Sequence, residues 1–110
     1  MSIVMNLYYT GKNGSARKFA EEMEHSGTAD LIRQEEGNER YAYFFPMDEP
    51  ETVLLIDIWK DQASIDQHHA SPMMGTIAQL REKYNLHMRA ERYVTDTDGV
   101  PATDSQFIRH

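Results

Sequence analysis

Alternating and continuous runs of apolar residues predict four β-strands. Thr52 to Trp59 is the clearest of them. It has the sequence T-V-L-L-I-D-I-W, which is apolar almost throughout and is typical of a central strand buried on both faces. The other runs mix branched, aromatic and polar residues and end near turn-forming residues. These strands are predicted at Ile3 to Tyr9, Glu39 to Phe45 and Leu86 to Val94.

Helical patterns separate the predicted strands. Over residues 16–23, apolar residues recur at i, i+3, i+4 and i+7, and Gly27 follows, which predicts an amphipathic helix and its end. Residues 28–38 show no clear period and are predicted as a loop with at most one helical turn. A short helix is predicted over residues 61–69 with an Asp at its start, and a longer helix begins near Pro72.

The order strand, helix, strand, strand, helix, strand predicts an α+β fold, the ferredoxin-like split βαβ arrangement with an antiparallel sheet. Helices cover one face of such a sheet, yet these strands are apolar on both faces. A chain of 110 residues has little left to cover the second face. We therefore expect a homodimer in which two sheets pack face to face. The domain is predicted at residues 1–94, and the tail, residues 95–110, ends in apolar residues that could dock on the partner subunit.

Charge and composition exclude several classes of function. The 18 acidic residues exceed the 11 Lys and Arg residues and give a net charge of −7, which disfavours nucleic acid and anionic membranes as partners. No run approaches the roughly 18 apolar residues that span a bilayer, and the N-terminus lacks a leader pattern, so a cytoplasmic location is expected. The absence of cysteine excludes thiolate chemistry and cysteine-bound metals. We predict neither a metal ion nor a cofactor.

Residues 55–72 resemble the antibiotic biosynthesis monooxygenase (ABM) domain family. They contain Trp59 at a strand end, an Asp-Gln-Ala helix start, His68 nine residues after the tryptophan, and then a Ser-Pro pair. Residues 37–41 are similar to the Gly-x-x-x-Tyr pattern with which that family begins its second strand. The resemblance extends over about residues 3–94.

This resemblance implies a dimeric α+β barrel of ferredoxin-like protomers, each with a pocket between its sheet and its helices. Members of the family include cofactor-independent oxygenases that convert aromatic quinols to quinones. Others degrade haem or isomerise small signalling sugars, and many have no known substrate. Membership in this family therefore indicates the fold better than the reaction.

Individual positions separate these branches. The haem-degrading branch uses an Asn in the first strand, a Trp in the short helix and a His in the next helix. Asn6 matches the first, but His68 stands at the Trp position, and the axial His falls near Ala78, which cannot coordinate iron. Haem degradation is therefore disfavoured. The quinol-oxidising branch is matched by Trp59 and His68, although a Met-Met pair at residues 73–74 replaces the His-Phe of many relatives.

His68 is the predicted proton acceptor. His68 and His69 are adjacent on the predicted short helix, so their side chains diverge by about 100° and do not form a metal-binding pair. The family position favours His68 in the pocket, where a neutral imidazole could accept a phenolic proton and leave a phenolate that reacts with dioxygen. His69 is predicted to contact the substrate. The alternative for His68 is a packing histidine bonded to a backbone carbonyl.

Asn6 is the predicted polar anchor. It interrupts an apolar strand, where an amide without a hydrogen-bond partner costs free energy. We predict that it orients a substrate carbonyl or hydroxyl in the same cavity as His68. The alternative is a hydrogen bond to a neighbouring loop.

Asp57 is predicted to be a partly buried carboxylate, because it lies in an otherwise apolar strand. Such a group needs a cationic or donor partner such as Arg89 or Arg92, and we interpret it as part of a structural or dimer-interface pair rather than a catalytic base. The acidic runs at residues 21–22 and 35–36 are interpreted as solvated surface.

Four further side chains are predicted to form the pocket walls around a flat ligand: Trp59, Tyr41, Tyr43 and Met74. Each has a structural alternative, as a core or dimer-interface residue.

The leading hypothesis is a cofactor-independent monooxygenase acting on an aromatic or quinol-like small molecule. One alternative is a non-catalytic ligand-binding or stress-response module that holds a small hydrophobic metabolite. The other is an isomerase of a small metabolite.

Overall fold

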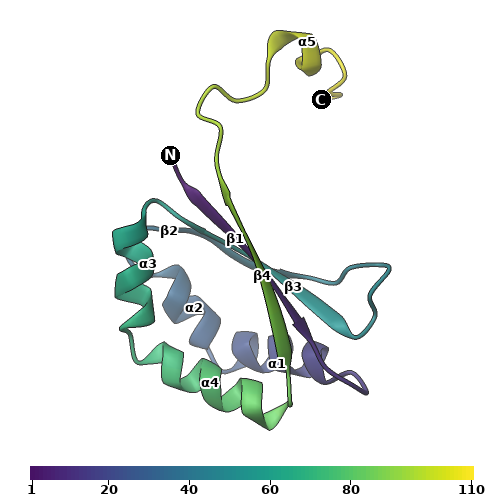
Figure 1. Ribbon diagram of the computed structural model, residues 1–110, viewed down its shortest axis with the longest axis vertical. Helices are drawn as coiled ribbons and strands as arrows, with labels where there is room; N and C mark the ends of the chain where they lie inside the picture. The colour runs from purple at the N-terminus through teal and green to yellow at the C-terminus, as the bar shows by residue number, and fades with distance from the viewer.

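One antiparallel sheet with helices on one face forms the body of the protein in this computed structural model, which describes residues 1–110 (Figure 1). The sheet has four strands in the order β2-β3-β1-β4, and every neighbouring pair is antiparallel. This arrangement confirms the predicted α+β, ferredoxin-like fold. The strands are β1 Ile3–Thr10, β2 Asn38–Phe44, β3 Thr52–Trp59 and β4 His87–Val94.

Four helices lie on the same side of the sheet, and a fifth lies in the tail (Figure 1). The predicted start of α3 is confirmed, because the Asp61 carboxylate accepts hydrogen bonds from the backbone N–H of Ser64 at 2.9 Å and from its hydroxyl at 2.7 Å. The helices are α1 Ser15–His25, α2 Thr28–Arg33, α3 Gln62–His69, α4 Met73–Lys83 and α5 Ala102–Ser105.

Helix α2 corrects the prediction of a loop after residue 27. Gly27 has a φ of 83°, which lets the chain turn sharply between α1 and α2. Ala29 and Ile32 are then fully buried, and Arg33 is held by ion pairs to Glu24 at 2.6 Å and Asp30 at 2.7 Å. A helix of six residues is too short to show a hydrophobic period in the sequence.

The core lies between the helices and one face of the sheet. Strand β3 is central, as predicted, and its Val53, Leu55 and Trp59 side chains are fully buried beneath the helices. The alternate residues, Leu54, Ile56 and Ile58, face the other way and are only half-buried. The expectation of burial on both faces is therefore met on the helix side only, because no element of this chain covers the other face (Figure 1).

The tail leaves the sheet after β4 and stands away from the body (Figure 1). Its first residue, Thr95, is still joined to β1 by a hydrogen bond from its backbone N–H to the Ser2 carbonyl at 2.9 Å. Beyond that point every residue is exposed, including Phe107 at 80%. None of the helices has the length and apolarity needed to cross a membrane.

Candidate functional site

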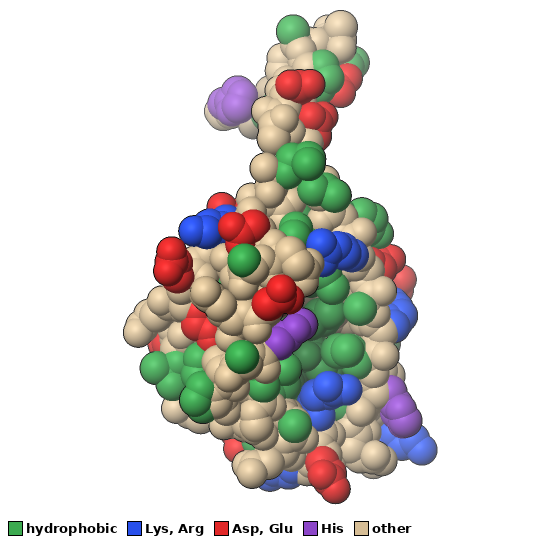
Figure 2. Space-filling view, turned by 60° about the vertical axis from the view of Figure 1, so that its left-hand side comes forward, with side chains coloured by type: hydrophobic (Ala, Val, Ile, Leu, Met, Phe, Trp, Pro, Cys, Tyr) green, Lys and Arg blue, Asp and Glu red, His purple; other side chains and the backbone are tan.

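A cavity of about 310 Å³ lies between the sheet and helices α3 and α4. Its lining comes from all four strands and both helices, and most of it is hydrophobic. Figure 2 shows it as a green hollow with a histidine at its edge and Lys or Arg side chains on its rim. Its size and lining suit a small aromatic molecule.

His68 is buried in the cavity wall, with 6% of its surface exposed. The ring lies against Trp59, with a centroid distance of 4.8 Å, and its Nδ1 is 2.8 Å from Oε2 of Glu35. Burial lowers the pKa of His68 below its usual value, although the Glu35 carboxylate acts in the opposite direction. The ring is therefore neutral near pH 7. In the tautomer that donates Nδ1–H to Glu35, Nε2 has a free lone pair and no partner within the chain.

Glu35 corrects the interpretation of residues 35–36 as solvated surface. Its side chain is only 16% exposed and holds the His68 ring, whereas Glu36 does lie in solvent. The turn after Glu35 packs closely on the start of α3, and a Cβ added at Gly37 would lie 2.1 Å from the Ser64 hydroxyl oxygen. Glu35 and His68 are 33 residues apart, and no sequence spacing predicts their pairing.

Asp57 lines the same cavity and is 5% exposed. Burial raises the pKa of its carboxyl group to about 7, although hydrogen bonds from the Trp59 and Asn38 side chains act against this rise. The predicted cationic partners do not pair with it. Arg89 lies on the other face of the sheet and pairs with Glu49, and Arg92 forms no ion pair.

Replacing Asp57 with Asn should change how stability depends on pH. Between pH 4 and 7 the unfolded chain ionises Asp57 while the folded chain keeps it protonated, so the free energy of unfolding falls as pH rises through that window. The free energy of unfolding of the Asn variant does not fall in this way, so its stability relative to the natural chain should rise by about 4 kcal/mol from pH 4 to pH 8. Urea denaturation at both pH values measures it. A pH-independent difference would show that Asp57 ionises normally in the folded protein.

The expected convergence of Asn6 and His68 is not found. Along β1, Met5, Leu7 and Tyr9 face the helices and line the cavity, so Asn6 projects from the opposite face of the sheet. Its Oδ1 is buried there without a hydrogen-bond partner. The sequence could not reveal this, because both faces of β1 are apolar.

Most of the remaining predicted residues do line the cavity: Trp59, Tyr41, Met74 and His69. Tyr43 lies behind the wall, where its hydroxyl bonds that of Tyr41 at 2.9 Å and its ring packs edge-on against Phe19. Burial raises the pKa of Tyr41 well above its usual value. Burial also raises the pKa of Tyr43, so both tyrosines stay protonated at neutral pH.

Two arginines of the cavity were not among the predicted site residues. Arg81 comes from α4 and Arg92 from β4. Their positions in the sequence could have revealed them. Arg81 lies one helical turn after the apolar Ile77, and Arg92 lies on the same strand face as Met88 and Ala90. No three His, Asp or Glu side chains in the structure gather as possible metal ligands.

Comparison with known proteins agrees with this architecture. A family model described as antibiotic biosynthesis monooxygenase matches residues 1–80. SnoaB, a cofactor-independent oxygenase from Streptomyces nogalater, is 14% identical, with a TM-score of 0.71 over 87% of this chain and 94% of its own. A comparison with curated proteins found no match.

Two further solved structures have the same fold. A provisionally named antibiotic biosynthesis monooxygenase from Nitrosomonas europaea is 17% identical, with a TM-score of 0.75 over 86% of this chain and 89% of its own. A conserved Methanosarcina mazei protein is 22% identical, with a TM-score of 0.72 over 87% and 94%. At such identities these likenesses establish the fold.

Proposed function

The chain belongs to the antibiotic biosynthesis monooxygenase family, and from this premise we propose that it oxidises an aromatic, quinol-like molecule with dioxygen and without a cofactor. The observation that carries the proposal is the neutral His68 in the cavity wall, oriented by Glu35 and backed by Trp59. Such a neutral imidazole, with a free lone pair on Nε2, is in the protonation state that a general base requires.

The proposed reaction begins with proton transfer from a substrate hydroxyl to Nε2 of His68. The Glu35 carboxylate, 2.8 Å from Nδ1, stabilises the imidazolium that forms. The resulting phenolate is electron-rich and reduces dioxygen. One oxygen atom forms a C–O bond at a ring carbon in place of a C–H bond. The O–O bond breaks, and the other oxygen leaves as water with two hydrogens from the substrate. The substrate therefore supplies all four electrons.

The test is oxygen uptake by the purified protein with a panel of aromatic quinols, corrected for the rate without protein. With ¹⁸O₂, mass spectrometry should find one labelled atom in the product. A ligand that binds and is recovered unchanged under air would support the non-catalytic binding alternative instead.

We further propose that the helix-free face of the sheet, centred on Leu54, Ile56 and Ile58, packs on the same face of a second copy. These side chains are half-buried in the single chain, and the orphaned Oδ1 of Asn6 lies among them. The side chain of Phe107 in the tail is also 80% exposed in the single chain. A second copy would cover all of these groups.

Replacing Ile56 with Glu should raise the dimer dissociation constant by about a hundredfold or more, because each protomer would bury a carboxylate in the proposed interface. Analytical ultracentrifugation over a dilution series measures the change. Ala78→Glu on the exposed side of α4 is the matched control and should leave dimerisation unchanged. A monomeric natural chain, or equal behaviour of both variants, would refute this interface.

A further inference from the structure

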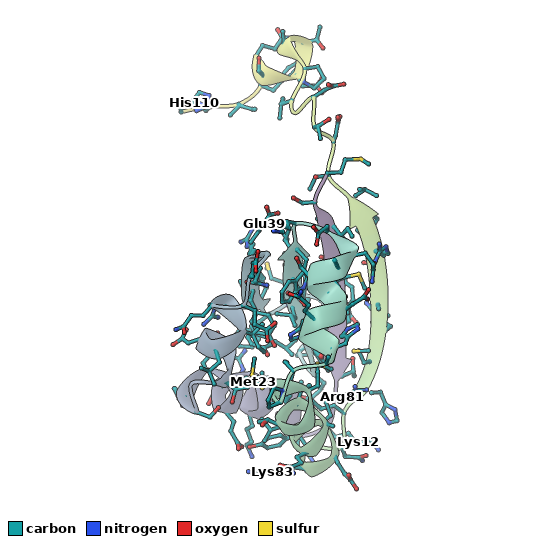
Figure 3. All side chains as sticks on the ribbon, turned by 90° about the vertical axis from the view of Figure 1, so that its left-hand side faces the viewer. Lys12, Met23, Glu39, Arg81, Lys83 and His110 are labelled. Atoms are coloured by element: carbon teal, nitrogen blue, oxygen red, sulfur yellow. The ribbon has the colours of Figure 1, made fainter.

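The rim of the cavity carries two guanidinium groups without acidic partners. Arg81 and Arg92 both line the cavity, yet neither forms an ion pair or a side-chain hydrogen bond within the chain. Figure 3 places Arg81 where α4 comes close to β4, and Figure 2 shows Lys or Arg side chains on two sides of the green hollow.

Acidic residues exceed Lys and Arg by 18 to 11 in this chain, yet only two of its seven arginines form ion pairs. Elsewhere, Arg33 bonds Glu24 and Asp30, and Arg89 bonds Glu49. Arg17, Arg40 and Arg109 also lack an ion pair, so what distinguishes Arg81 and Arg92 is their position in the lining of the apolar cavity.

The acidic content of the cavity does not neutralise these charges. Asp57 is the only acidic residue in the lining, and it is already held by Asn38 and Trp59. Because burial raises the pKa of Asp57 to about 7, this carboxyl is about half protonated at neutral pH. Two fixed positive charges therefore face a largely apolar space with less than one compensating negative charge.

The arginines approach this space from two ends. Arg92 pairs with Met5 in the β1–β4 register, whereas the Arg81 guanidinium lies 6.0 Å from the ring centroid of Tyr9. Met5 and Tyr9 are four residues apart on one face of β1, which separates them by about 13 Å. A flat ring system between them would have a cation within reach at each end.

We infer that the cavity binds an aromatic carboxylate, with its rings on the apolar floor against Trp59 and its carboxylate at Arg81 or Arg92. Guanidinium groups recognise planar carboxylates through paired N–H donors. The inference rests on the proposed function in taking this cavity as the substrate site, and it narrows the quinol-like substrate to one that carries an acidic group.

Binding of two non-oxidisable probes tests the inference apart from turnover. 2-Naphthoate and the neutral, nearly isosteric 2-naphthamide should be compared by calorimetry at low salt under argon. We expect 2-naphthoate to bind at least about tenfold more tightly. The double variant Arg81→Gln/Arg92→Gln should lose that preference while still binding 2-naphthamide, and the single variants should show which end receives the carboxylate. Arg17→Gln, whose guanidinium lies 3.7 Å from the Phe45 ring centroid outside the cavity, is the charge-matched control for the single variants and should keep the preference.

Equal affinity for the two probes, or a preference that survives in the double variant, would overturn the inference. These outcomes are independent of the proposed reaction. Oxygen uptake with neutral quinols but no carboxylate preference would leave the oxygenase proposal intact and remove this one. A carboxylate preference without any oxygen uptake would support this inference and remove the oxygenase proposal.

Discussion

Replacing His68 with Ala is expected to lower kcat for quinol oxidation by about a hundredfold or more. General-base catalysis by a positioned side chain contributes about 10²- to 10⁴-fold, and no other histidine in the cavity has a carboxylate to orient it. KM should change little, because Trp59 and the apolar floor still hold the rings. Steady-state oxygen uptake at saturating quinol measures the loss.

Two further variants separate catalysis from structure. His25→Ala, on the exposed side of α1, is the matched control and should keep the natural rate. Glu35→Gln should lower kcat by about tenfold, because the amide still orients the ring but no longer stabilises the imidazolium. Since Glu35 raises the pKa of His68, this variant should also move the acid limb of the pH profile to lower pH. A His68→Ala protein with natural kcat would remove the assigned role.

The fold was predictable because its strands and helices are marked by long apolar patterns and by contacts between residues close in sequence. The apolarity of the β3 segment alone predicts a central strand. Asp61 marks the start of α3 because its carboxylate accepts a hydrogen bond from Ser64, only three residues away. Helix α2 was not predictable on the same grounds. Its six residues become helical because Ala29 and Ile32 are buried against the sheet, which is a tertiary effect.

The candidate site was predictable only in part. His68 and Trp59 lie together in the cavity as the family pattern implies, with their rings 4.8 Å apart. Asn6 lies on the other face because strand parity assigns a residue to one of two faces without saying which face the helices cover. Glu35 reaches His68 from a loop 33 residues away, and the sequence alone gives no sign of such a contact.

The Glu35–His68 contact depends on a close approach that only glycine permits, which makes Gly37→Ala the most destabilising single change we predict. Gly37 has a φ of 86°, and an added Cβ would lie 2.1 Å from Oγ and 2.6 Å from Cβ of Ser64. Ser64 cannot easily move away, because its hydroxyl bonds Asp61 at 2.7 Å in the cap of α3. The turn and the helix start must therefore separate.

Gly27→Ala is the matched control for the backbone effect. Gly27 has nearly the same φ, 83°, but nothing lies within 4 Å of its added Cβ. Its substitution should cost only the left-handed backbone strain, about 1–2 kcal/mol. Gly37→Ala adds overpacking of about 1–3 kcal/mol, for a total of about 2–5 kcal/mol and a loss of about 10–20 °C in Tm.

Urea denaturation of both variants at one protein concentration measures the difference. Gly37→Ala should also reduce oxygen uptake below the unfolding temperature, because the turn that carries Glu35 shifts away from His68, whereas Gly27→Ala should keep the natural rate. Equal destabilisation by the two substitutions would mean that the Gly37 turn does not pack on α3. A large destabilisation without loss of activity would mean that Glu35 does not need that turn to position His68.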